Sequence, residues 1–286
     1  MARKDDIQIR SLQTYKELLE TEDLHRKVWK YPEPTNAKLL LTVKETGGYV
    51  AGAYLKGELV GFSYALLAKD EKGLYLRSQS LVVLKEFRDR GIGLLLRRAQ
   101  RDYALGLGMK KMEWTFDPLQ TRLGSFYIKK LGAIVKRYHP HLYERPEMKS
   151  LKRVTSDRFY AEWYLDSPRV VSRLEHLSSS GQKKEPTSIS EEILVNSVSF
   201  SEDTPEISDY SLDRNFPELL VEIPGNIEDI LPFPDIRQQW RSSTQKIFDT
   251  YINQKKYTVV DFISLGNKGK RRNFYLLSKK PPGDPA

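Results

Sequence analysis

The chain has 286 residues and contains no cysteine, which excludes disulfides, zinc–thiolate sites and a cysteine nucleophile. Hydrophobic residues make up 39% and charged residues 30%, enough to bury a core in one large domain or two modest ones. The formal net charge of +9 permits an anionic cofactor, nucleic acid or a membrane surface as partner and selects none of them. We find no apolar stretch long enough for a signal peptide or a membrane span, so we expect a cytoplasmic protein.

The first third of the chain predicts a strand, two helices and a three-strand meander. Residues 7–10 alternate apolar and polar side chains, as a short strand does, and helical spacing follows at 12–29 and 37–44. The helices are separated by prolines, which lack the backbone N–H and restrict the residue before them. Short turns containing glycine then divide three strand-forming runs, which are 49–55, 59–67 and 74–84.

Helices and strands alternate in the next part of the chain, and the composition then changes. The pattern predicts helices at 91–105 and 123–131 and strands at 111–116, 133–138 and 159–165. The serine-rich stretch 178–186 has almost nothing to bury, which is typical of a linker. We therefore expect a domain over residues 1–166, a polar linker over 167–190 and a smaller α+β extension over 191–286. The sequence shows no internal repeat.

The loop before the predicted helix at 91–105 reads Arg88-Asp89-Arg90-Gly91-Ile92-Gly93. A helix start presents unpaired N–H groups and a positive dipole end, and glycine lets backbone approach a phosphate closely. Arg88 and Arg90 add charge-assisted contacts to phosphate oxygens. An ATP-type phosphate loop is absent from the sequence, and the third glycine of a dinucleotide fingerprint would fall at Leu96.

Two stretches carry a resemblance to the GNAT family of acyl-CoA-dependent N-acyltransferases. Leu81-Val82-Val83 followed by the loop just described resembles the family's apolar strand end and Arg/Gln-x-x-Gly-x-Gly/Ala pattern, and Phe126–Ala133 resembles its helix beside the cofactor thiol. The resemblance covers residues 6–166, and the whole chain is similar to a less characterised bacterial and archaeal branch with a C-terminal extension. The implied fold is α/β, a mixed sheet with a smaller α+β extension.

The resemblance implies acetyl-CoA or another acyl-CoA as co-substrate, and no metal. Its pyrophosphate would bind the loop, and its pantetheine arm would pair with backbone groups of Leu81, Val82 and Val83. Asp117 and Glu113 share a strand face and are candidates to accept a proton from the amine or orient it. The alternative for Asp117 is to cap the following helix.

Tyr127 is the candidate acid for the departing thiolate. The family's tyrosine lies four residues before the glycine that ends this helix, whereas Tyr127 lies five before Gly132, so the alternative is that Tyr127 packs. Trp29, Tyr31, Arg77 and Arg122 are candidates for the acceptor side; the alternatives are a core role for Trp29 and solvated arginines. A metal pair at His139 and His141 would lack a third ligand, so a surface loop is the preferred interpretation.

The predicted function is an acyl-CoA-dependent N-acyltransferase of the N-acetyltransferase type. It would move the acyl group directly to the amine of a small molecule or amino acid. One alternative is an amino-acid N-succinyltransferase, which the basic surplus suits. Another is a non-catalytic acyl-CoA-binding or regulatory module. A third, a nucleic-acid-associated protein, is favoured by charge alone. The extension could pack over the acceptor site, mediate a homodimer, or finish the sheet.

Overall fold

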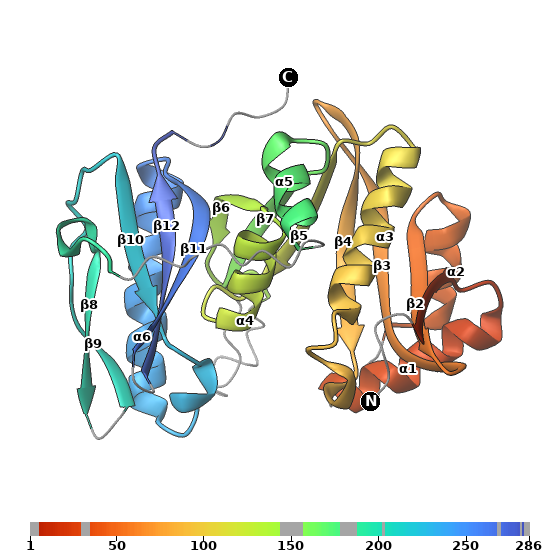
Figure 1. Ribbon diagram of the computed structural model, residues 1–286, viewed down its shortest axis with the longest axis horizontal. Coiled ribbons are helices and arrows are strands. Elements are labelled where there is room, and N and C mark those ends of the chain that lie inside the picture. Colours follow the sequence, from red (N-terminus) through yellow and green to blue (C-terminus); the bar gives the residue numbers. More distant parts are fainter. Residues whose placement is uncertain are drawn as a thin grey trace. The chain divides into compact units, whose positions relative to one another are not determined.

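A computed structural model describes residues 6–29, 35–143, 157–177, 188–201, 204–267, 270–280 and 282 (Figure 1). The chain divides into two compact units, Met1–Trp114 and Thr115–Ala286. Within the described ranges, every helix is too short or too polar to cross a membrane. The predicted domain boundary at 166 does not coincide with the division between the units, and it stays a prediction.

Unit 1 is a twisted sheet with helices on both faces. The order of its strands is β1-β2-β3-β4-β5, with antiparallel neighbours up to β4 and a parallel pair β4–β5. The strands are β1 (Ile7–Ser11), β2 (Tyr49–Leu55), β3 (Glu58–Asp70), β4 (Gly73–Val83) and β5 (Lys111–Phe116). The helices are α1 (Tyr15–Trp29), α2 (Ala37–Glu45), the 3₁₀ turn η2 (Lys85–Phe87) and α3 (Ile92–Gly106). The predicted mixed α/β fold is confirmed.

The two faces of this sheet bury separate apolar clusters. Helices α1 and α2 cover one face, where Leu18 and Leu40 pack with Phe62 of the sheet. Helix α3 covers the other face, with Ile92 and Leu96 against β2 and β3. Burying a side chain of this size contributes about 2 kcal/mol. The apolar contacts of Ile92 and Leu96 therefore hold the start of α3 against the sheet, beside the end of β4.

Five strands of unit 2 are ordered β7-β6-β11-β12-β10, and all neighbours in this order are antiparallel. They are β6 (Ile134–His139), β7 (Arg158–Tyr164), β10 (Glu218–Ile223), β11 (Thr258–Asn267) and β12 (Lys270–Ser278), with a separate hairpin of β8 (Asn196–Ser201) and β9 (Thr204–Tyr210). The helices are α4 (Thr121–Gly124), α5 (Pro168–His176) and α6 (Pro234–Phe248). Two π-helical turns, η3 (Ser125–Lys130) and η7 (Asp249–Gln254), extend α4 and α6, and η5 (Glu191–Ile193) and η6 (Ile227–Asp229) are 3₁₀ turns.

The predicted linker is in part a helix. Helix α5 occupies 168–176, capped by the Ser167 side chain at the backbone N–H of Val170, and it buries Val170 and Leu174. A nine-residue helix with only two buried positions is easily missed from periodicity. The serine-rich stretch 178–186 lies outside the described residues. The α+β extension is confirmed as a β/α region, although its β8–β9 hairpin was not predicted.

Candidate functional site

Strands β4 and β5 pair only briefly. Among the described residues, their parallel pairing consists of Leu76 with Met112 and Arg77 with Glu113. Directly after Arg77, β4 contains a bulge, because Ser78 and Ser80 lie opposite consecutive residues of β3. A bulge bends its strand and increases its twist, so it turns β4 away at the point where pairing with β5 ends. The backbone of 81–83 lies beyond that point and pairs only with β3 in the described registers.

A buried polar cluster stands where the two strands stop pairing. Arg97 of α3 is 2% exposed and donates to Ser78 Oγ and Gln100 Oε1, at 2.7 Å in each case. Its guanidinium also lies 4.2 Å from the ring centre of Trp114 on β5. A buried arginine needs such partners, because an uncompensated charge is costly in a core. Arg97 thus connects α3 to both strands at the start of their separation.

The loop after β4 presents an open helix start. Asp89 and Gly91 have left-handed backbones, with φ of 62° and 82°, and Gly91 is the N-cap of α3. Since glycine has no side chain, no side-chain cap hydrogen bond closes this end of the helix. Arg88 Nε donates to Val83 O at 3.1 Å, which ties the loop to the strand end, while Arg90 is exposed. An open helix start of this kind is suited to binding an anion, and the predicted role of the loop stays a prediction.

Buried hydroxyls on the sheet add a feature that the sequence analysis missed. Among the described residues, Ser80 Oγ on β4 and Ser63 Oγ on β3 are buried without a hydrogen-bond partner. Buried hydroxyls are usually paired, so an orphan just past the β4 bulge can be explained by a bound ligand or water. The available signal was two serines at alternate positions of a predicted strand, Ser78 and Ser80, which place their side chains on the same face.

Glu113 lies in an ion-pair group rather than in an open position. Its side chain is 4% exposed and bonds Arg77 at 3.2 Å and Lys111 at 2.9 Å. Lys111 also pairs with Asp70 at the far end of β3. The predicted substrate role of Arg77 and the catalytic role of Glu113 stay predictions, with the two side chains bound to each other in this structure.

In unit 2, Asp117 lies directly after β5 and receives a bidentate contact from the C-terminal region. Arg241 of α6 donates from both terminal nitrogens, to Oδ1 and Oδ2, at 2.6 Å each. Oδ1 also accepts from the backbone N–H of Leu119 at 2.9 Å, in the turn before α4, whereas the N-cap of α4 is Gln120, so Asp117 does not cap that helix. The two side chains are 8% and 15% exposed, which makes this a largely desolvated pair. Arg241 was not predicted.

Tyr127 lies within the π-helical turn η3 and is 7% exposed. Its ring packs edge-on against Phe116 at 5.3 Å and beside Phe126 at 5.1 Å. A π turn contains one residue more than an α turn, which accounts for the displaced spacing of Tyr127 from Gly132. Arg122 lies in α4 and is exposed.

The acceptor-side candidates are only partly described. Trp29 ends α1, but its side chain and the whole of Tyr31 lie outside the described residues. His139 Nδ1 lies 2.7 Å from Pro140 O, and His141 Nε2 lies 2.6 Å from Gln245 of α6. In the described part of the chain, no group of three or more metal-ligating side chains comes together.

Tyr138 lies within electrostatic reach of the Asp117–Arg241 pair and of a further buried carboxylate, Asp157. The backbone N–H of His141 donates to Asp157, which is 5% exposed. Burial and the nearby charge of Asp157 raise the pKa of Tyr138 well above its ordinary value, so its hydroxyl stays protonated. Helix α6 therefore contacts both the end of β5, through Arg241, and the loop that follows β6, through Gln245.

Comparisons with known proteins find one family model and several solved structures that resemble part of the chain. A model of the acetyltransferase (GNAT) family matches residues 13–133. The chain resembles Arabidopsis thaliana Naa50 in complex with a bisubstrate analogue (20% identity, TM-score 0.44, 55% of this chain and 97% of that one). It also resembles the ribosomal-protein-S18-alanine N-acetyltransferase from Escherichia coli (13%, 0.46, 56% and 95%). A third is a GNAT family acetyltransferase from Elizabethkingia anophelis with acetyl-CoA bound (16%, 0.41, 56% and 99%). No curated protein matches the chain.

The family match spans the meander, the loop at 88–93, helix α3 and the strand–helix pair that follows. These are the elements that form the open helix start and the separation of β4 from β5. Residues 13–133 therefore match the acetyltransferase (GNAT) family, and a further C-terminal region lies beyond that match.

Proposed function

We propose that the protein transfers an acyl group, acetyl in the first instance, from coenzyme A to the amine of a small molecule or amino acid. The observation that carries the proposal is the uncapped start of α3 at Gly91, directly after a strand that turns away from its neighbour. A thioester supplies an activated carbonyl carbon. The new bond joins that carbon to the amine nitrogen, the carbon–sulfur bond breaks, and the amine proton must leave.

The residues present fit coenzyme A. The first N–H groups of α3 would bind its pyrophosphate, with Arg88 and Arg90 adding positive charge. The backbone of 81–83 would pair with the amides of its pantetheine arm, since β5 does not pair with that stretch in the described register. The orphan hydroxyl of Ser80 offers one further hydrogen bond on the same strand.

For Asp117 we propose that it orients the acceptor amine. A carboxylate has about four sites for accepting hydrogen bonds. Arg241 occupies one on each oxygen and the N–H of Leu119 occupies a second on Oδ1. One site therefore remains on Oδ2, which is enough to accept a hydrogen bond from the acceptor amine or from a water molecule.

Tyr127 remains the candidate that protonates the departing thiolate. Replacing Tyr127 with phenylalanine should lower kcat with little change in KM if its hydroxyl has this role. An unchanged turnover rate would assign the ring to packing against Phe116 alone.

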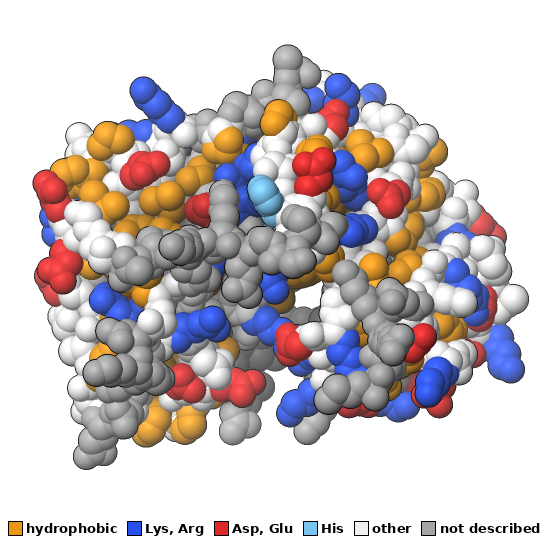
Figure 2. Space-filling view, in the orientation of Figure 1, with side chains coloured by type: hydrophobic (Ala, Val, Ile, Leu, Met, Phe, Trp, Pro, Cys, Tyr) orange, Lys and Arg blue, Asp and Glu red, His pale blue; other side chains and the backbone are white. Residues whose placement is uncertain are grey.

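One observation favours the non-catalytic alternative. Both carboxylates proposed for catalysis, Glu113 and Asp117, already hold arginine side chains. The nucleic-acid alternative has less support, because basic and acidic side chains are interspersed over the face shown in Figure 2. The succinyl donor is a further alternative for the same site.

A thiol-release screen tests the proposal. Acetyl-CoA and succinyl-CoA would each be crossed with a panel of amines, amino acids and peptides, with calorimetric binding of both donors measured in parallel. We expect thiol release with at least one pair. Binding of a donor without release for any acceptor would support the non-catalytic module, and absence of both binding and release would reject the proposal.

A further inference from the structure

Two stretches of the chain follow the same path. The first motif is β5, α4, η3, β6 and β7, and the second motif is β10, α6, η7, β11 and β12 (Figure 1). Each runs from a strand into a helix that ends in a six-residue π turn, and then into two antiparallel strands. In both, the same two backbone hydrogen bonds end the turn. They are Leu131 N to Phe126 O and Ala133 N to Tyr127 O in the first motif, and Lys255 N to Thr250 O and Tyr257 N to Tyr251 O in the second, all 2.8–3.0 Å.

The backbone after the π turn is also repeated. Gly132 has φ of 79° in the first motif, and Lys256 has φ of 60° at the matching position of the second. A lysine is strained in this left-handed region, so its presence indicates that the backbone path, not the residue, determines the conformation. The following strands each carry a bulge at matching places, between Val135 and Arg137 and between Val259 and Asp261.

The two motifs are related by an internal two-fold axis. A two-fold axis requires matching residues to meet each other and other contacts to occur in reciprocal pairs. Val135 pairs with Val259, its own counterpart, where antiparallel β6 and β11 join the motifs. Phe159 likewise packs against its counterpart Tyr275, with 5.2 Å between ring centres.

Reciprocal contacts occur on either side of this axis. Phe248 packs against Tyr138 and Phe159, with ring centres 5.7 and 4.7 Å apart. Gly124, the counterpart of Phe248, lies against Phe262 and Tyr275, the counterparts of the other two rings, and a Cβ there would lie 2.5 Å from the Tyr275 hydroxyl. One phenylalanine and one glycine thus fill a shared core in which two phenylalanines would collide.

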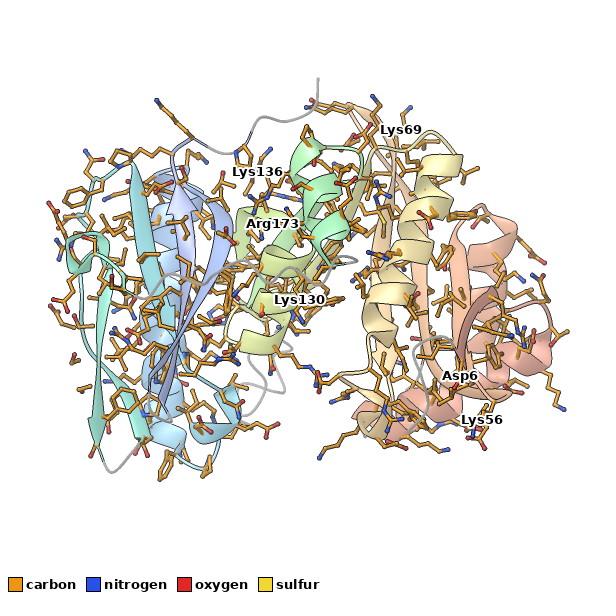
Figure 3. The ribbon with its side chains drawn as sticks, in the orientation of Figure 1. Asp6, Lys56, Lys69, Lys130, Lys136 and Arg173 are labelled. Atoms are coloured by element: carbon orange, nitrogen blue, oxygen red, sulfur yellow. The ribbon has the colours of Figure 1, made fainter. Side chains whose placement is uncertain are left out.

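Helix α5 fastens the motifs together. Arg173, which is labelled on α5 in Figure 3, donates to the carbonyl oxygens of Ile128 and Lys129 in the first motif. It also donates to Asp261 in the second motif, at 2.8 Å. Arg169 likewise bonds Gly132 O at 3.0 Å and also contacts Val260 O. The seam between the motifs is therefore both apolar and hydrogen-bonded.

The second motif has a closed counterpart of the β4–β5 separation. In the first motif, β4 pairs in parallel with β5, the last pair being Arg77 with Glu113. In the second motif, Leu194 forms a parallel bridge to Leu220, which is the matching position of a six-residue strand. The Asn196 amide then bonds both the N–H and the C=O of Glu222, at 2.9 and 3.1 Å. The Asn196 side chain thus bonds the backbone of β10 just beyond the Leu194–Leu220 bridge. This is the place where β4 and β5 separate in the first motif.

We propose that residues 218–278 are a degenerate copy of residues 111–164 that takes the place of a partner subunit. It covers the β6 edge, on which a second chain could otherwise extend the sheet, and it brings Arg241 to Asp117. Its own donor position is closed by Asn196, and the pattern Arg-x-x-Gly-x-Gly occurs once in the sequence. The protein is therefore a monomer with one acyl-CoA site. The site count rests on the proposed function, whereas the monomer does not.

Two measurements on the full chain test this proposal. Sedimentation velocity over a wide concentration range should give the mass of one chain, and a concentration-dependent dimer would overturn the replacement of a partner. Calorimetric titration with acetyl-CoA should give one molecule per chain, and two would overturn the closure of the second motif.

A loop variant separates the two possible donor positions. Gly91→Val should remove acetyl-CoA binding completely, because a β-branched residue is strained at φ of 82°. Gly106→Ala is the control, since a methyl group there meets no atom within 4 Å. Saturable binding that persists in Gly91→Val would reveal a second site and overturn the proposal. If the unaltered chain bound no acyl-CoA, the proposed function would fail, and the sedimentation result alone would decide whether the second motif replaces a partner.

Discussion

The first and second motifs share a backbone path and differ at the end of their first strand. In the first motif, β5 is followed by Asp117, whose carboxylate accepts two hydrogen bonds from Arg241. In the second, β10 is followed by Pro224, which has no side-chain charge, and its carbonyl accepts from Thr121 at 2.7 Å. The same fold thus presents a charged group in one motif and only structural contacts in the other. The fold therefore does not require a carboxylate after this strand, so Asp117 is free to serve a reaction.

The shared core between the motifs should be the most sensitive to change. Phe248→Ala removes a fully buried ring that contacts Tyr138, Phe159 and Tyr275, so we expect a loss of about 3–5 kcal/mol in the free energy of unfolding. Chemical denaturation would measure it. Leu107→Ala is the control, because Leu107 is 54% exposed and should change stability by less than about 0.5 kcal/mol. A comparable loss in both variants would mean that the seam is not a core.

Changes to the Asp117–Arg241 pair, at the end of β5, should have the next largest effect on stability. Arg241→Met leaves Asp117 largely buried without its partner, and we expect a loss of about 3 kcal/mol in stability. Combining Arg241→Met with Asp117→Asn removes the unpaired charge and should restore part of that stability.

Measurements of enzyme activity then show whether the Asp117–Arg241 pair has a functional role or only a structural one. If Asp117 orients the amine, the stabilised double variant should still have reduced activity, with the acceptor KM raised and acetyl-CoA binding unchanged. Recovery of full activity together with stability would show that the pair is only structural.

The local features of this chain could be predicted from sequence, and the long-range ones could not. Helix and strand positions in unit 1 follow from apolar periodicity and from glycine and proline turns. The open start of α3 follows from Gly91, which has no side chain to cap the helix. Arg241, in contrast, lies 124 positions from Asp117 in the sequence, and nothing near either residue indicates the other. A partner supplied by a separate part of the fold leaves no local pattern.

The internal repeat was missed for a related reason. The motifs share few identical residues, such as Tyr127 with Tyr251 and Val135 with Val259, and α6 is much longer than α4. What is repeated is hydrogen bonding and backbone direction, including a left-handed position that is glycine in one motif and lysine in the other. These properties depend on packing across the axis, so a search for similar residues at a fixed period does not detect them.

Removing the Asn196 hydrogen bonds that close the second motif should have a moderate effect on stability. Asn196→Ala removes two hydrogen bonds to the backbone of Glu222, which leaves buried polar groups unpaired and should cost about 1–3 kcal/mol. Acetyl-CoA stoichiometry should remain one per chain, because the second motif lacks an anion loop. Denaturation and calorimetric titration on the same variant would check both. A gain of a second binding event would indicate that Asn196 alone blocks a competent site.

The smallest expected effect lies outside both motifs, at the start of α1. Glu17 accepts hydrogen bonds from the N–H groups of Thr14 and Gln13 and pairs with Arg10. The bond from Thr14 is the main cause that lowers the pKa of Glu17 to about 2, against the opposing effect of partial burial. Because the folded-state pKa is lower than the ordinary value of 4.5, this contribution is present above pH 4.5 and is lost as the pH falls towards 2.

Glu17→Gln keeps the capping geometry but removes the charge, so it should cost about 0.5 kcal/mol at neutral pH, and the difference from the unaltered chain should vanish near pH 2. Thermal unfolding from pH 7 to pH 2 would measure this. Since Glu17 caps a helix of unit 1, the variant should leave the effects of Phe248→Ala and Asn196→Ala unchanged when combined with either one. Non-additive stabilities in those combinations would show that the seam of unit 2 is coupled to the first helix of unit 1. The contrast between the two motifs would then not be a property of unit 2 alone.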